Sequence, residues 1–125
     1  MQGGQFSQVS SADYTTTGNT QHFRLSITGA AALLSTYITG GLPMWAVSKT
    51  ETRSPSAVLL SQEAASSGSV YVTWDGQTTP LANGQLGFAI PTAPNFMRIP
   101  GRDVLKVLKI IASGTTQYVQ AYFEP

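Results

Sequence analysis

Side chains able to do chemistry are few in this chain, and no two of them stand at a diagnostic spacing. His22 is the only histidine, and there is no cysteine. A zinc site would have to be built almost entirely from carboxylates, and any nucleophile would have a single imidazole as its base. We therefore interpret His22 as a surface or interface side chain and expect no metal and no cofactor.

The acidic residues are spread along the sequence, one to a segment. A glycosidase needs two carboxylates that converge on one bond, and this spacing favours no such pair. Asp75 stands before Gly76 and Asp103 follows Gly101, so both are interpreted as turn formers whose carboxylates bond nearby backbone. No serine lies in a Gly-x-Ser-x-Gly elbow and no phosphate-binding loop is present, so the sequence predicts a protein that is not an enzyme. The other acids are Asp13, Glu51, Glu63 and Glu124.

Charge is scarce in this sequence. Only 10% of the residues are Asp, Glu, Lys or Arg, against about 25% in an average soluble domain, and the net charge is +1. Binding to nucleic acid through phosphates normally needs a large basic excess, so nucleic acid is a disfavoured partner. No apolar run reaches the ~18 residues of a membrane span, and no secretory signal is expected. Four basic residues fall within twelve positions and are interpreted as solvated strand edges, with an ion pair to an acidic partner as the alternative: Arg98, Arg102, Lys106 and Lys109.

The polypeptide divides into an N-terminal arm, residues 1–20, and a single domain, residues 21–125. The arm is rich in Gly, Ser, Thr and Gln and has too few apolar residues to order by itself, so we expect it to order on a neighbouring subunit. Aromatic side chains in the arm and in irregular segments are candidate anchors, because such side chains are enriched at interfaces. The candidate contacts between subunits are Phe6, Tyr14, Tyr37, Trp45, Arg98 and Arg102.

Alternation of apolar and polar residues predicts short strands separated by Gly and Pro at intervals of about 8 to 12 residues. Residues 29–38 favour either a short helix or a loop with a second strand, and residues 49–56 favour a loop. Residues 104–112 contain leucines that allow a helix, but their β-branched content favours a strand. The pattern indicates an all-β fold, an antiparallel β-sandwich or jelly roll. The predicted strands are 22–28, 44–48, 57–60, 69–74, 86–90, 95–99, 104–112 and 116–123.

Most aromatic side chains fall in these predicted strands and are expected mainly in the core. An alternative is a carbohydrate-binding face, on which an exposed Trp45 or Trp74 and nearby tyrosines would stack against sugar. The strand aromatics are Tyr71, Trp74, Phe88, Phe96, Tyr118, Tyr122 and Phe123.

The C-terminal half carries a recognisable series of turns and strands. Residues 70–80 read Val-Tyr-Val-Thr-Trp-Asp-Gly-Gln-Thr-Thr-Pro, and Asn83-Gly84 follows. Residues 99–111 read Ile-Pro-Gly-Arg-Asp-Val-Leu-Lys-Val-Leu-Lys-Ile-Ile, and residues 118–123 read Tyr-Val-Gln-Ala-Tyr-Phe. Over about 55 of the 125 residues, this pattern resembles the C-terminal half of small tailed-bacteriophage virion proteins.

The resemblance implies a β-sandwich that assembles symmetrically in the virion. The expected partners are copies of the same chain and the major capsid protein or other virion proteins, with the role of a capsid decoration (cement) protein. A neck or tail ring component is the alternative. The composition agrees for its own reason, because low charge reduces the desolvation cost of closing large interfaces.

Overall fold

The computed structural model describes residues 21–64 and 67–125. The predicted arm, with Phe6 and Tyr14, lies outside the described residues. The elements, in chain order, are β1 (His22–Ile27), β2 (Ala32–Leu33), the 3₁₀ helix η1 (Leu34–Tyr37), β3 (Trp45–Ala46), β4 (Thr52–Arg53), β5 (Ala57–Gln62), β6 (Val70–Thr73), β7 (Phe88–Ala89), β8 (Met97–Pro100), α2 (Arg102–Val107), β9 (Lys109–Ala112) and β10 (Gln117–Glu124).

The strands form an antiparallel β-sandwich whose pairing follows a single rule. Apart from the hairpin β3–β4, the first strand pairs with the last: β1 with β10, β2 with β9, β5 with β8 and β6 with β7. This is a long antiparallel ribbon rolled up on itself, and the rolling adds the pairs β10–β5 and β9–β6. The result is a jelly roll of two four-stranded sheets, as the sequence predicted.

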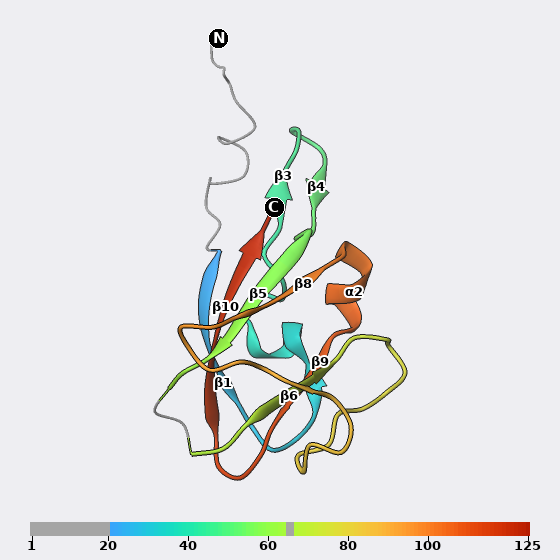
Figure 1. Cartoon of the computed structure of the whole chain (residues 1–125). Coiled ribbons are helices and arrows are strands. Elements are labelled where there is room, and N and C mark those ends of the chain that lie inside the picture. The colour runs from blue at the N-terminus through green and yellow to red at the C-terminus, as the bar shows by residue number, and fades with distance from the viewer. Residues whose placement is uncertain (1–20, 65–66) are drawn as a thin grey trace.

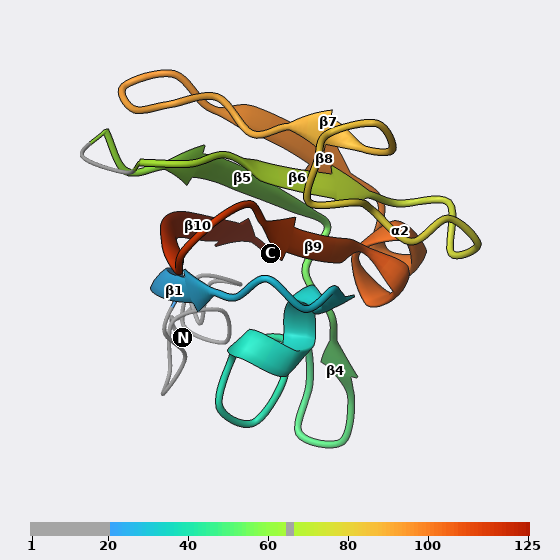
Figure 2. The same ribbon diagram turned by 90° about the horizontal axis from the view of Figure 1, so that it is seen from below.

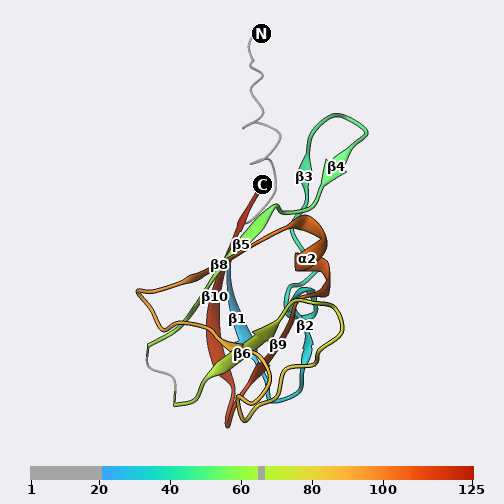
Figure 3. The same cartoon turned by 45° about the vertical axis from the view of Figure 1, so that its right-hand side comes forward.

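We name the sheets A and B. Sheet A has the order β1-β10-β5-β8, and sheet B has the order β2-β9-β6-β7. The chain crosses repeatedly from one sheet to the other, so that β9 and β10 are consecutive in the sequence but belong to different sheets (Figure 2). The hairpin β3–β4 is inserted between β2 and β5 and projects from one end of the sandwich (Figures 1 and 3).

The core lies between the two sheets and is closed at the ends by η1, α2 and Trp45. The strand side chains that fill it come from alternate positions, because successive residues of a strand point to opposite faces. The buried members are Leu25, Ile27, Leu34, Ile38, Trp45, Val58, Leu60, Val70, Val72, Ile90, Ile99, Leu105, Leu108, Ile110, Ala112, Val119, Ala121 and Phe123.

The strand predicted over residues 104–112 is wrong in its first half. The structure has helix α2 there, followed by the shorter strand β9. Gly101, at φ 114°, turns the chain out of β8, and Leu105 and Leu108 are both buried against the core. Asp103 is not the expected turn former. It lies in the first turn of α2, where a carboxylate interacts favourably with the helix dipole and stabilises the helix. The helix has only six residues, so its helical periodicity is too short to be recognised in the sequence against the preference of its valines for strands.

Two irregular segments also contain more structure than the sequence indicated. Residues 29–38 hold both β2 and η1, so each of the two alternatives was partly correct. The expected loop 49–56 contains β4, which pairs with β3 through Trp45 and Arg53.

Candidate functional site

Strand β10 shows how the exposed surface of sheet A arises from the sequence. Its residues alternate between buried and exposed or half-exposed over its whole length. Val119, Ala121 and Phe123 point into the core, while Tyr118 and Tyr122 point away from it. Since β10 is a central strand of sheet A, its outward side chains form the middle of a surface.

The neighbouring strands supply the rest of that surface in register. Tyr122 lies between His22 of β1 and Leu59 of β5, and Gln120 lies between Arg24 and Ser61. We call this surface the outer face. Its residues are His22, Arg24, Ser26, Leu59, Ser61, Glu63, Phe96, Arg98, Tyr118, Gln120, Tyr122 and Glu124.

The four acidic and basic residues of the outer face neutralise one another in two ion pairs. Arg24 donates from Nε and Nη2 to the two carboxylate oxygens of Glu63, at 2.6 and 3.0 Å. Arg98 makes the same two-bond contact with Glu124, at 3.1 and 2.9 Å. These hydrogen bonds lower the pKa of Glu63 and of Glu124 and raise the pKa of each arginine.

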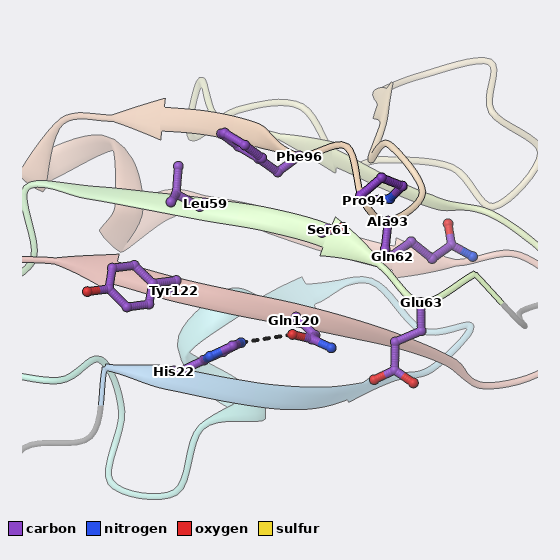
Figure 4. Close-up of a pocket in the computed structure, with 10 residues that line it drawn as sticks. All are labelled: His22, Leu59, Ser61, Gln62, Glu63, Ala93, Pro94, Phe96, Gln120 and Tyr122. Atoms are coloured by element: carbon purple, nitrogen blue, oxygen red, sulfur yellow. Dashed lines mark hydrogen bonds between the residues drawn. The ribbon is translucent and has the colours of Figure 1, made fainter.

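Between the two ion pairs runs a groove of about 280 Å³ (Figure 4). Its floor is formed by β1, β10 and β5, and the segment 93–96 forms one wall. His22 Nε2 lies 2.9 Å from Gln120 Oε1, and the imidazole meets the Tyr122 ring edge-on at 6.0 Å between centroids. The wall is held to β5 by a hydrogen bond from Ser61 Oγ to the Asn95 carbonyl at 2.7 Å.

The groove has the character of a binding surface. Phe96 is 59% exposed and Tyr122 39% exposed, so two large aromatic side chains are accessible in a groove that His22 and Gln120 also line. Exposed apolar and aromatic side chains that line one groove of a soluble domain commonly mark a site of contact with a partner or ligand. Amide, hydroxyl and imidazole groups beside the rings provide hydrogen bonds to a neutral partner.

A second aromatic pair lies at the side of the sandwich where β7 and β8 are the outermost strands. Trp74 and Phe88 stack with their centroids 5.0 Å apart, and Phe88 is 60% exposed. A hollow of about 320 Å³ beside them is lined by Met97, Ile99 and other residues of β8 and α2. One face of the Trp74 ring is thus covered by the Phe88 ring of the same chain.

Four of the predicted contact residues lie within the described part of the chain. Trp45 is only 1% exposed, so its prediction as an exposed anchor or sugar platform is wrong, because the ring fills the end of the core. Tyr37 is half-buried, and its hydroxyl donates to the Ala30 carbonyl. Arg98 belongs to the outer face, and Arg102 donates to the Ser54 carbonyl at 3.1 Å, with no role in that face.

Asp75 is a turn former, as the sequence predicted. Its carboxylate accepts hydrogen bonds from Thr78 Oγ1 at 2.6 Å, from Thr78 N at 2.8 Å and from Gln77 N at 2.9 Å. The first of these contributes most to lowering the pKa of Asp75 to about 2. The carboxylate therefore fixes a loop.

Three residues of the outer face were expected mainly in the core: Phe96, Tyr118 and Tyr122. The signal that places the tyrosines was present in the alternation of residues 118–123, in which they share a phase with Gln120 and oppose Phe123. Phe96 has no such signal, since it precedes β8 and its exposure depends on how the segment 93–96 leaves the sheet.

Among residues 21–64 and 67–125, no three His, Asp or Glu side chains are grouped so as to hold a metal ion. The helices in that part of the chain are all too short to cross a membrane. Comparisons with protein-family models, with curated proteins and with solved structures each gave no match. The class that fold and site define is thus a jelly-roll domain with an exposed aromatic face.

Proposed function

We propose that this chain is a non-enzymatic virion structural protein that associates with copies of itself and stabilises a phage capsid as a decoration (cement) protein. The observation that carries the proposal is the outer face of sheet A, which presents aromatic side chains while its charges are paired among themselves. Covering such a face removes apolar surface from water without stranding an unpaired charge.

Two further features support this role. The jelly roll is an architecture used by viral capsid domains and by lectins. The sequence of residues 70–123 resembles small tailed-phage virion proteins, and a neck or tail ring component is the alternative location within that class.

The test is co-sedimentation of the purified chain with particles of the phage whose genome encodes it. We expect stoichiometric binding and a higher melting temperature of shells to which the protein is added back. Replacing Tyr122 and Phe96 by alanine together should remove both effects, while Phe88→Ala, which alters the second aromatic pair, serves as the control. A chain that ignores both capsids and isolated necks and tails would overturn the proposal.

A second candidate function is carbohydrate binding in the groove. It is favoured by the presence of Phe96, Tyr122 and Gln120 in the lining of one groove, since rings and an amide suit a neutral sugar. Retention on a glycan column with elution by free sugar, lost in Phe96→Ala, would establish it in place of capsid binding.

A further inference from the structure

The edges of the two sheets differ in how well they are protected against pairing with another strand. An exposed edge offers unpaired N–H and C=O groups, and proteins blunt such edges with very short strands, proline or charge. The edge strands of sheet B are β2 and β7, of two residues each. Both are too short to template a partner.

Strand β8, one edge of sheet A, is blocked by proline. Gly101 N donates to the Ser56 carbonyl of the segment that leads into β5. The backbone N–H and C=O groups of residues 97, 99 and 101 therefore point toward β5, while those of residues 98 and 100 point away from the sheet. Pro100 therefore stands at an outward position, where it has no N–H to offer and its ring obstructs an approaching strand.

Strand β1, the opposite edge of sheet A, is neither short nor interrupted by proline. It is six residues long and contains no proline. Phe123 N donates to the Gln21 carbonyl, so residues 21, 23, 25 and 27 face β10, while the backbone groups of His22, Arg24 and Ser26 face outward. Within residues 21–64 and 67–125, no strand pairs with this side of β1.

The one charged side chain of β1, Arg24, points away from the open edge of the strand. Arg24 reaches back over β10, with its guanidinium carbon 3.9 Å from the centre of the Tyr118 ring, to its two-bond contact with Glu63. An arginine that would normally repel a second strand is thereby neutralised on the outer face. At the other end, the Tyr37 hydroxyl accepts from Thr28 N at 3.4 Å, which marks where the open edge stops.

We propose that β1 pairs antiparallel with β1 of a second copy of this chain across a twofold axis. The inference rests on the proposed function, in that it names the contact by which copies associate. A strand edge is self-complementary under such an axis, because each outward residue exchanges an N–H and a C=O with its counterpart. The longest register places Arg24 opposite Arg24 of the second copy and His22 opposite Ser26, which makes three pairs of two hydrogen bonds each.

This pairing joins the two outer faces. Two copies of sheet A become one eight-stranded sheet, with the tyrosines of both copies and both grooves on the same side. The aromatic surface available to a capsid is then doubled, and its two halves are related by symmetry.

The first experiment alters only the edge. Ser26→Pro removes an outward N–H and places a ring in the path of the second strand, while the preceding Leu25 is already extended, as a residue before proline prefers to be. Ser26→Ala is the matched control. By light scattering on a sizing column, we expect the unmodified chain and Ser26→Ala to have twice the mass of one chain, and Ser26→Pro to have the mass of one chain. The near-ultraviolet circular dichroism of Ser26→Pro should be unchanged.

A second experiment reads the register and remains informative if Ser26→Pro fails to fold. The chain has no cysteine, so single cysteines report one contact each. In the proposed register the two Cα atoms at position 24 lie about 5.5 Å apart, within disulfide range, while those at position 22 are separated by roughly 14 Å. Arg24→Cys should cross-link under oxidation, and the control His22→Cys should not.

Several results would overturn the edge pairing. A monomeric unmodified chain would do so, as would a dimer indifferent to Ser26→Pro or equal cross-linking at positions 22 and 24. If amide hydrogen exchange found residues 22, 24 and 26 protected in a monomer, the occupant of the edge would be the chain's own residues 1–20. Capsid binding by a monomeric Ser26→Pro protein would leave the proposed function standing, whereas dimers that ignore capsids would refute that function alone.

Discussion

The outer faces of the two sheets lie on either side of the same core but differ in what covers them. On sheet B, residues 75–87 fold back over β6: Thr73 Oγ1 donates to the Thr78 carbonyl at 2.6 Å, and Gly84 and Gly87 approach Tyr71 closely. On sheet A, Tyr118 and Tyr122 are 37% and 39% exposed, and among residues 21–64 and 67–125 the segment 93–96 stands at the side of the groove. We call residues 75–87 the sheet B cover.

The difference teaches that the two faces of the same sandwich use their side chains in different ways. Covering sheet B requires glycine at points of close approach and a fixed turn at Asp75, which are devices of intramolecular packing. The outer face of sheet A instead pairs its charges locally and leaves rings exposed. One face is thus packed by the chain's own loop, while the other is the face for which we propose association.

The largest effect is expected from truncating β10 on its buried side. Phe123→Ala should reduce the free energy of unfolding by about 3–5 kcal/mol, because it removes a fully buried ring from the core. Its neighbour on the outer face, in Tyr122→Ala, should change that free energy by about 1 kcal/mol or less. Urea denaturation measures both, and equal losses would show that the outer face is part of the fold rather than a contact surface.

The next effect tests the sheet B cover. Gly84 has φ 79°, and a Cβ added there would lie 2.9 Å from Cζ of Tyr71. Gly84→Ala should destabilise the fold by about 1–3 kcal/mol through backbone strain, and by more through the clash. Gly40→Ala is the control for strain alone, since Gly40 has φ 83° and nothing within 4 Å. If the two variants melt at the same temperature, the cover does not press on Tyr71.

A smaller effect concerns the dependence of stability on pH. The folded pKa of Asp75, about 2, lies below its value of 3.8 without these contacts. Its stabilising contribution is therefore fully present above about pH 4 and is lost as the pH falls through 2. Asp75→Asn should flatten the acid limb of stability between pH 4 and 2 in urea titrations. An acid limb identical to that of the unmodified chain would mean that the Asp75 turn does not hold the cover.

The smallest change in melting temperature is expected from the ion pairs of the outer face, because exposed pairs contribute little to folding. Glu63→Gln should nevertheless weaken the dimer, since it releases Arg24 to face its counterpart across the twofold axis. Glu124→Gln is the matched control, because it releases Arg98 on the far side of the face. Sedimentation velocity at several concentrations separates the two, and equal weakening would argue against the β1 contact.

The fold was largely predictable from the sequence because strand alternation is a local pattern. The strands at residues 22–28, 57–60 and 116–123 were identified, and so was the antiparallel all-β class. Two wrong predictions, a strand in place of α2 and an exposed Trp45, have local causes as well. Helix α2 is shorter than two helical turns, and Trp45 lies in β3, a strand of two residues that is too short for alternation to indicate which side is buried.

The candidate site was less predictable, because it is assembled from distant parts of the chain. Arg24 and Glu63 are 39 positions apart, and His22 and Gln120 are 98 apart. Their spacing in the sequence follows no motif, since the pairing of β1 with β10 and of β10 with β5 brings them together. Arg98 was a candidate from the sequence, but its partner Glu124 was not.

By itself, the sequence determined that β10 has one apolar and one polar-aromatic side, and that few charges oppose close contact. Only the tertiary structure decided that residues 75–87 cover sheet B while, within the described residues, the tyrosines on sheet A stay partly exposed. It also decided that β1 is the one long edge of the described sheets without a proline. The reason is physical. A strand's two faces are set by neighbouring residues, but what covers a face or an edge depends on which other segment reaches it after the ribbon has rolled up.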